Sequence, residues 1–426
     1  MLAPKTGLVY QDIAIAIAYV LLGRLVLQGR WSAARSVIFA ALNIIAMYLL
    51  FFWGRDERFT AVFNLLFAAY IGFVSLQYLV LRFSGSFSQR TAWLAFWMPI
   101  GFLVFVRYAP VLYFAHRLNE SIYAVLVRHP EFTLNLVFVG CSYLAFRTSY
   151  LVLEVRNGTV PRPSYPDYLT FAFFVPTLSV GPISRYSEHR LAFVADKKPE
   201  IPFATALLRV LVGAVKFRFL SPLLNQLTYS GLLLDGHPHP WIDLPIAGLA
   251  YYLYLYCNFS GFCDIAVGGA GLIGISVSEN FSNPFAARNV ADFWNRWHIT
   301  LSQYMRDVVF SPLSRFLIRS TGPKFAMHAI AVAITIVFLL VGVWHGVGWN
   351  YAAFGAVHAL GVAVNHYYTI FLKKSLGAKG YAAYEQNAVV RALAITLTFA
   401  FVTVSLFFFA NDGQAMRQIF SSLRFH

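Results

Sequence analysis

Long hydrophobic runs, each separated from the next by a short polar stretch, dominate this chain. A helix needs about 20 mostly apolar residues to cross the hydrocarbon layer of a membrane. Runs of this kind predict about eleven or twelve transmembrane helices. They lie near residues 10–28, 35–53, 60–82, 92–114, 133–153, 168–184, 203–222, 242–257, 261–277, 326–344, 350–371 and 388–410. The pattern therefore predicts an all-α polytopic membrane protein.

Two of these runs are irregular. The run 168–184 holds Pro176 and Pro182, which break or kink a helix. The run 261–277 is interrupted by four glycines, Gly268, Gly269, Gly271 and Gly274. Broken helices at membrane depth are tolerated only when they are buried in protein or line a cavity. We therefore expect the first half of the chain to be scaffold and the second half to hold the site.

Composition supports a membrane protein and excludes several other classes. Of the 426 residues, 59% are hydrophobic and only 12% are charged, whereas a soluble domain carries about 25% charged residues. This excludes a soluble enzyme, a disordered chain and a disulfide-stapled secreted domain. The net charge is +15, and in a membrane protein such charge faces anionic lipid headgroups, so we expect lipid and no nucleic acid as a partner.

The three cysteines, Cys141, Cys257 and Cys263, all lie in apolar surroundings without metal-ligand spacing. Buried free thiols are the expected reading. A redox pair stays open for Cys257 and Cys263, because they flank what the sequence suggests is a glycine-containing turn.

Residues 284–320 do not behave like a span, because charged residues cluster there among aromatic and aliphatic ones. At helical spacing one apolar stripe forms, consisting of Val290, Phe293, Trp297, Leu301, Tyr304 and Val308. This predicts amphipathic helices at an interface or dipping into the protein, with Asn289 or Asn283 as the cap.

Polar residues inside two hydrophobic runs are candidates for function, because ionisable groups at membrane depth are costly unless paired or wetted. His345 follows a long apolar run, and Asn258, Ser260 and Asp264 break another one. A histidine that only satisfies hydrogen bonds in the core is the competing interpretation for His345. We expect His358 and His366 to be ordinary interior or interface histidines.

The motifs that are missing narrow the chemistry. The chain has no GxSxG elbow, no GxxxxGK[ST] phosphate loop and no HExxH, so a serine hydrolase, a phosphate-loop enzyme and a catalytic metal lack support. A buried histidine with a pKa near neutrality can deprotonate a hydroxyl. Acyl transfer to a hydroxyl therefore fits the residues, although they do not require it.

Five segments, taken together and in order, resemble the signature of the membrane-bound O-acyltransferase (MBOAT) family, in particular its bacterial branch. They are FFVPTLSVGPISRY (173–186), YCNFSGFCDIAVGGAGLIGI (256–275), ENFSNPF (279–285), DFWNRWHITLSQYMRDVVFSPL (292–313) and VGVWHGVGWNYAAFGAVHALG (341–361), with a softer echo in FRTSYLVLEVRNG (146–158). The clear match covers about residues 170–365.

The resemblance implies roles for particular residues. His345 matches the family's catalytic histidine and is expected to be the general base on the acceptor hydroxyl. His298 matches a second histidine of bacterial members and is expected to help orient the acyl group or the thioester. Arg296, Trp297 and Trp344 are expected to line the same chamber. Ser260 and Asp264 match the family's polar turn and are expected beside that chamber. Relatives usually carry Asp where this chain has Asn258, so no role that needs a negative charge is carried over to Asn258.

The resemblance also implies an architecture and a set of partners. The family fold is a ring of about 11–12 tilted helices around a tunnel lined by re-entrant and amphipathic helices. We expect a single membrane domain, 1–426, with scaffold helices in 1–165, the catalytic core in 166–371 and a C-terminal helix in 372–426. No tightly bound cofactor is expected. The acyl donor would be acetyl-coenzyme A or a phosphopantetheine-loaded acyl carrier protein, and an extracytoplasmic acyltransferase partner is expected at a bacterial inner (cytoplasmic) membrane.

The residues alone leave two other classes open. A transporter or channel also uses broken helices and buried polar groups. A non-catalytic scaffold for an acyltransferase complex is the second alternative. Loss of His345 separates these classes, because only the enzyme needs the imidazole for acylation.

Overall fold

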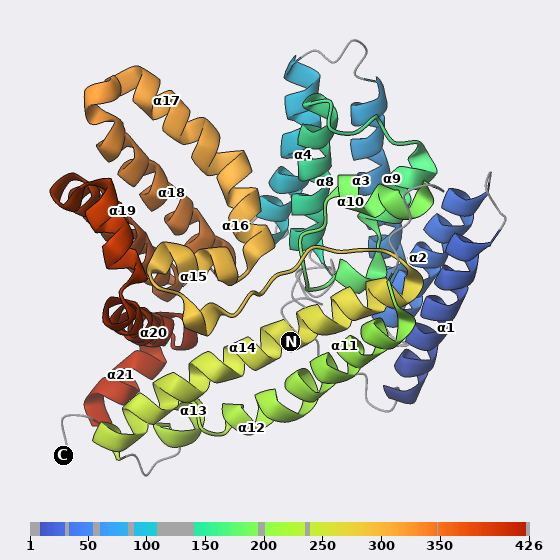
Figure 1. Ribbon diagram of the computed structural model, residues 1–426. Helices are drawn as coiled ribbons and strands as arrows, with labels where there is room; N and C mark the ends of the chain where they lie inside the picture. Colours follow the sequence, from blue (N-terminus) through green and yellow to red (C-terminus); the bar gives the residue numbers. More distant parts are fainter. Residues whose placement is uncertain are drawn as a thin grey trace, which may run out of the picture. The chain divides into compact units, whose positions relative to one another are not determined.

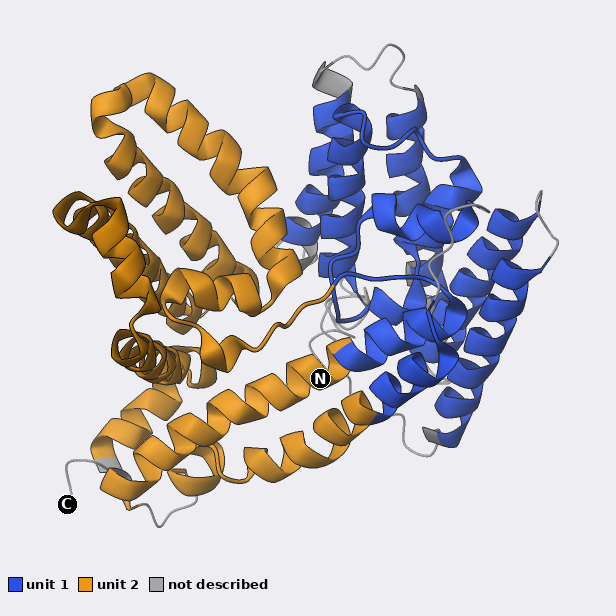
Figure 2. Ribbon diagram, viewed as in Figure 1, with its two compact units in different colours: residues 1–211, 264–278 blue, residues 212–263, 279–426 orange. Residues whose placement is uncertain are grey.

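The computed structural model describes residues 9–29, 34–53, 60–83, 89–108, 140–194, 201–234, 239–346 and 348–422, and Figure 1 shows their arrangement. These residues form helices, and the only β pairing among them is an isolated antiparallel bridge between Phe281 and Trp297. They divide into two compact units, coloured separately in Figure 2. Unit 1 comprises residues 1–211 and 264–278, and unit 2 comprises residues 212–263 and 279–426.

Unit 1 is built mainly from the N-terminal helices. They are α1 (Val9–Gln28), α2 (Arg35–Phe51), α3 (Thr60–Phe83), α4 (Gln89–Tyr108), α8 (Cys141–Arg156), α9 (Tyr165–Ala172), the single-turn α10 (Tyr186–His189) and most of α11 (Phe203–Val215). Helix α1 packs on α2, α2 on α9, α3 on α4, and α4 on α8. A core cluster joins Tyr19 of α1 and Phe39 of α2 to Ile273, which comes from a distant part of the chain.

Helix α8 holds the irregular segment 173–186 through two buried charged residues. The Arg147 guanidinium donates to the carbonyl oxygens of Phe171 (3.0 Å) and Phe174 (3.5 Å), and to both the carbonyl and the hydroxyl of Thr177. Two turns further along α8, the Glu154 carboxylate accepts hydrogen bonds from the backbone N–H groups of Tyr186 (2.9 Å) and Ser187. A single helix thus satisfies backbone groups at both ends of the segment, which has little regular hydrogen bonding of its own.

Unit 2 carries the remaining helices. They are α12 (Ser221–Asn225), α13 (Tyr229–Leu232), the larger part of α14 (Pro240–Ile273), α15 (Val290–Arg296), α16 (Ile299–Met305), α17 (Ser311–Thr321), α18 (Ala326–His345), α19 (Trp349–Gln386), α20 (Ala388–Ala410) and α21 (Gly413–Ser422). One π-helical turn joins α11 to α12 at Lys216–Leu220, and another joins α16 to α17 at Arg306–Phe310. Helix α18 packs between α17 and α19, and α19 also packs on α20 (Figure 1).

The prediction that glycines break the helix in residues 261–277 is wrong. The predicted spans 242–257 and 261–277 are joined in one continuous helix, α14, which ends at Ile273, directly before Gly274 with φ +101°. Glycine in a helix interior costs only about 1 kcal/mol of stability relative to alanine. In α14 the missing side chain also lets the backbone of a neighbouring segment come close. A Cβ on Gly268 would lie 2.8 Å from the carbonyl oxygen of Ala206.

Because α14 is continuous, two further expectations are also wrong. Cys257 and Cys263 do not flank a turn, and they form no disulfide with each other or with Cys141. Ser260 and Asp264 likewise lie within the helix and not in a polar turn.

The other sequence predictions fare unevenly. Proline breaks 168–184 as expected, because α9 ends at Ala172 and Pro176 lies in a short 3-10 turn. Helix α19 extends beyond the predicted end at 371 to Gln386, with a kink at Gly377, whose φ is +65°. Helices α20 and α21 follow it, so the stretch after 372 is not a single helix. The predicted stretches 109–114 and 133–139 lie outside the described residues. By length and composition, three described segments could cross a membrane: Tyr10–Gln28, Pro323–His345 and Ala388–Ala410.

The apolar stripe of 284–320 is confirmed, but not as one helix. Its residues from Val290 to Tyr304 are buried. Val290 and Phe293 lie in α15, Leu301 and Tyr304 in α16, and Trp297 between the two helices. Asn289 caps α15, with its side chain accepting the backbone N–H of Asp292 at 2.8 Å. The stripe therefore packs inside unit 2.

Candidate active site

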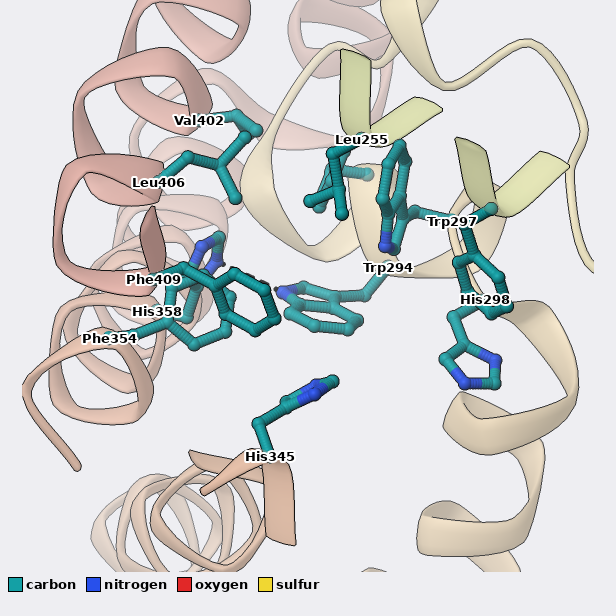
Figure 3. A pocket seen from close by; sticks show the side chains of 12 residues that line it. Leu255, Trp294, Trp297, His298, His345, Phe354, His358, Val402, Leu406 and Phe409 are labelled. Atoms are coloured by element: carbon teal, nitrogen blue, oxygen red, sulfur yellow. Dashed lines mark hydrogen bonds between the residues drawn. The ribbon is translucent and has the colours of Figure 1, made fainter. Parts of the chain in front are cut away.

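Unit 2 contains a small cavity of about 50 Å³ whose lining is aromatic and aliphatic except for three histidines. The histidines are His298, His345 and His358, and Figure 3 shows their rings among the residues that line the cavity. The remaining lining residues are Leu255, Phe259, Phe293, Trp294, Trp297, Phe354, Val402, Leu406 and Phe409. The space is sufficient for a few water-sized groups.

A local irregularity of the backbone positions His298. The residue has φ +46° and lies between the end of α15 and the start of α16. A left-handed backbone is uncommon for a residue with a Cβ and must be held by its surroundings. Two backbone hydrogen bonds flank the site: Ser282 N–H to Arg296 C=O and Ile299 N–H to Asn280 C=O, both 3.0 Å.

The His298 ring is fixed by Asn280 and by aromatic neighbours. Its Nδ1 lies 3.3 Å from Oδ1 of Asn280, and the Phe259 ring meets it edge-on at 4.7 Å. Nε2 is buried and has no hydrogen-bond partner in the described part of the chain. Burial, and after it the charge of nearby His345, lowers the pKa of His298 from 6.5 to about 3, so the ring is neutral at physiological pH.

His345 is the last residue of α18. Its ring packs against Trp344 (centroids 4.7 Å apart) and edge-on against Phe409 (4.9 Å). Glycines around this motif let α18 and α19 touch, since a Cβ on Gly342 would lie 2.3 Å from the carbonyl oxygen of Tyr351. The close contact of the two helices fixes where the imidazole enters the cavity.

His358 differs from the other two histidines because both of its ring nitrogens are engaged. The indole N–H of Trp294 donates to Nδ1 at 3.1 Å, and Nε2 lies 2.9 Å from the Ser405 hydroxyl. The Ser405 hydroxyl itself donates to the Val402 carbonyl, so Nε2 carries the proton. This histidine is structural, as expected from the sequence, although the sequence did not place it in the cavity wall.

The structure brings four of the predicted site residues together. His298, His345 and Trp297 line the cavity, and the Trp344 ring neighbours both histidines, with its centroid 6.2 Å from that of His298 and 4.7 Å from that of His345. Arg296 does not line the cavity, because its Nε is hydrogen-bonded to Asp292 at 2.9 Å.

The three polar residues of α14 also lie outside the cavity lining. Asn258 donates to the Ser221 hydroxyl at 3.0 Å, and the Ser260 hydroxyl is buried without a partner among the described residues. Asp264 belongs to unit 1 and forms an ion pair with Arg209 at 3.1 Å.

Sequence reasoning missed Asn280, the polar residue that organises the site. It is 1% exposed, and its side chain bonds to His298, Thr300 and Cys263. The signal was present, since Asn280 belongs to the ENFSNPF segment, but nothing in its spacing indicates a contact with a histidine 18 residues away.

Comparison with known proteins identifies the family of this chain. The model of the membrane-bound O-acyltransferase (MBOAT) family matches residues 74–407. A teichoic acid D-alanyltransferase of Streptococcus thermophilus is 30% identical to this chain, over 81% of this chain and 88% of that protein's length. A probable alginate O-acetylase of Pseudomonas aeruginosa is 28% identical over 76% of this chain and 60% of its own. A peptidoglycan O-acetyltransferase of Helicobacter pylori is 28% identical over 57% of this chain and 43% of its own.

The family match spans all five sequence segments and the cavity histidines His298, His345 and His358, and the helical fold agrees with it. The chain therefore belongs to the bacterial branch of the membrane-bound O-acyltransferase family and is a multi-pass membrane O-acyltransferase.

Proposed function

We propose that this protein moves an acetyl or D-alanyl group from a cytoplasmic thioester donor to a hydroxyl acceptor on the outer face of the inner membrane, and so modifies a cell-envelope polysaccharide or glycopolymer. The relatives support the class of acceptor, because they are named for teichoic acid, alginate and peptidoglycan. The observation that carries the proposal is the presence of His298 and His345 in one largely apolar cavity.

The cavity suits this reaction in three respects. Its imidazoles can accept and donate the protons that transfer to a hydroxyl requires. Its volume of about 50 Å³ admits a short acyl group and excludes a long acyl chain. Its apolar lining keeps out bulk water, which would otherwise hydrolyse the thioester.

In the reaction, the acceptor oxygen attacks the carbonyl carbon of the thioester and loses its proton to an imidazole. The C–S bond then breaks, and the departing sulfur takes up a proton to leave as a thiol. The resemblance to the family assigns the base to His345 and the orientation of the thioester to His298.

The donor and the partners belong to the same proposal. The donor is acetyl-coenzyme A or an acyl group carried on the phosphopantetheine arm of a cytoplasmic carrier protein, and the protein holds no tightly bound cofactor. A second, extracytoplasmic acyltransferase completes transfer to the polymer. The net charge of +15 supports docking of an acidic carrier protein, which predicts that its binding weakens as salt is added.

The decisive experiment mixes purified full-length protein with labelled acetyl-coenzyme A and, separately, with labelled acyl-carrier protein. Label transfer to a polymer-derived acceptor from one donor alone identifies the acyl group. His345→Ala should abolish transfer, whereas His328→Ala should not, because His328 lies on the exposed face of the same helix. Full transfer by His345→Ala would show instead that the protein is a scaffold, and solute flux that survives in this variant would indicate a transporter.

A further inference from the structure

A second and larger cavity lies within unit 1, and we call it the polar cavity. Its volume is about 310 Å³, at the lower end of the range of about 300–1,000 Å³ that is usual for small-molecule sites. Its wall is mainly polar and carries charge, unlike the aromatic wall around the three histidines of unit 2. The polar residues that matter for its chemistry are Arg162, Asp167, Thr170, Tyr186, His189 and Arg190.

Hydrogen bonds within unit 1 hold the wall of the polar cavity in place. The Thr170 hydroxyl donates to the carbonyl oxygen of Asp167 at 2.8 Å. The Thr170 oxygen therefore accepts from Nε2 of His189, which lies 3.2 Å away. The Glu154 carboxylate accepts from the backbone N–H of Tyr186. Helix α10, which carries Tyr186 and His189, is thereby tied to both α8 and α9, and the wall is preformed.

The carboxylate of Asp167 has only uncharged side-chain partners. Its Oδ1 accepts from the Ser36 hydroxyl and its Oδ2 from the Ser164 hydroxyl. It forms no ion pair with any residue that the structure describes. A carboxylate has about four acceptor positions, so two remain for further donors. A donor that also carries positive charge, such as an ammonium group, suits these positions best.

The opposite charge in the wall comes from arginine. The half-buried Arg190 has no ion pair or hydrogen bond within the described ranges of the chain, and Arg162 borders the same space. Burial raises the pKa of Tyr186, with the charge of Asp167 adding to this effect and that of Arg190 opposing it. The Tyr186 phenol thus stays protonated near both charges. Guanidinium groups and a hydroxyl donor together suit a phosphate.

The position of the polar cavity indicates where such a ligand comes from. Ser36, which also borders it, is the second residue of α2. Helix α2 is an apolar helix of 17 residues, Arg35–Phe51. The end of an apolar helix in a membrane lies at the level of the lipid headgroups. A charged cavity at this end is therefore placed to receive a headgroup.

We propose that the polar cavity binds the phosphoethanolamine headgroup of a membrane phospholipid. The phosphate faces Arg162, Arg190 and the Tyr186 hydroxyl, and the ammonium group faces Asp167. A phosphate without an ammonium group leaves the Asp167 charge unpaired, and a quaternary ammonium cannot donate hydrogen bonds to it. The bound headgroup bridges α2, α9 and α10. This role is separate from acyl transfer, and its test needs no turnover.

Native mass spectrometry of the full-length protein with added lipid measures this binding. Phosphatidylethanolamine, phosphatidylcholine and phosphatidylglycerol with identical acyl chains are added separately. We expect phosphatidylethanolamine to bind about tenfold or more tightly than either of the others, because only its headgroup offers both a phosphate and ammonium N–H donors. Equal affinities for the three lipids would overturn the proposal.

Arg190→Gln is the principal variant, because this change breaks no contact that the described residues make. It should weaken phosphatidylethanolamine binding by about tenfold. Arg156→Gln is the matched control, since Arg156 is an exposed arginine of the same unit that does not border the polar cavity. Its affinity for the lipid should stay unchanged, and equal effects of the two variants would disprove the site.

Asp167→Asn tests the ammonium end of the headgroup. An amide oxygen still accepts a hydroxyl, but the charge is gone, so the preference for phosphatidylethanolamine over phosphatidylcholine should vanish. Comparison of two lipids on one variant is a control for folding, because a misfolded protein loses both. A preserved preference would refute the role of Asp167. Water-soluble glycerophosphoethanolamine should compete only weakly, and competition at concentrations equal to those of the lipid would overturn the assignment to a membrane lipid.

Discussion

Replacement of Arg147 by methionine tests whether a buried guanidinium holds segment 173–186 in place. In Arg147→Met the carbonyl oxygen of Thr177 loses the only donor that the structure gives it. The carbonyls of Phe171 and Phe174 keep backbone donors, from Phe174 N–H and Thr177 N–H respectively. A buried acceptor without a partner costs about 1–3 kcal/mol. One full loss and two partial ones predict that the free energy of unfolding falls by about 2–4 kcal/mol.

The assay is thermal unfolding of the full-length protein in detergent, followed with a thiol-reactive dye. The dye reports unfolding because Cys141 is free and buried on the same helix. A loss of this size should lower the melting temperature by roughly 2–4 °C, because the unfolding entropy of a chain of 426 residues is about 0.9 kcal/mol/K. Arg156→Met is the matched control: this arginine ends α8, is exposed, and only stacks on Trp93 at 4.9 Å, so its loss should cost less than about 1 kcal/mol. Equal shifts for the two variants would refute the reasoning.

Three further predictions use the same unfolding assay. Gly261→Ala should destabilise the protein by about 1–3 kcal/mol, because its Cβ would lie 2.8 Å from the carbonyl oxygen of Gly213; Gly269→Ala, with nothing within 4 Å, should be neutral or stabilising, and equal losses would contradict this. His358→Phe should cost about 1–3 kcal/mol, because the indole N–H of Trp294 loses its acceptor; an unchanged melting temperature would disprove it. Because the pKa of His298 is lower in the folded state than in the unfolded one, the unfolded chain binds more protons, and stability should fall as pH drops from about 6.5 towards 3. This part of the slope should be absent in His298→Gln, and an identical slope in both proteins would count against a neutral buried ring.

Helices were predictable from the sequence where apolarity alone decides the structure. The bounds of α1, α18 and α20 agree closely with the runs predicted at 10–28, 326–344 and 388–410. The single helix α14 was not predictable, because glycine is read locally as a breaker. Its tolerance here depends on a tertiary contact, the approach of backbone from α11.

The site was partly predictable. His345 and His298 came from recognisable motifs, and the structure brings them into one cavity with Trp297. Asp264 was expected beside the chamber, but it forms an ion pair with Arg209. The sequence could not show this, because the pair depends on which face of α14 packs on α11. Asn280 could not be found, because its importance lies in a hydrogen bond to a ring 18 residues away, across a backbone turn with φ +46° that no propensity predicts for histidine.

The discontinuity of unit 1 has a consequence for how the protein is made. Its core needs Ala270, Ile273 and Ile275 against residues of α1 and α2, and the Arg24 guanidinium reaches the carbonyl oxygen of Leu272, 248 positions later. During synthesis the N-terminal helices must therefore remain in the membrane with that core incomplete until residues 212–263 have been synthesised. A nascent chain stopped before residue 264 would leave this surface open to chaperones and proteases. Quality control of this protein is thus expected to act on the interval between synthesis of α2 and synthesis of the end of α14.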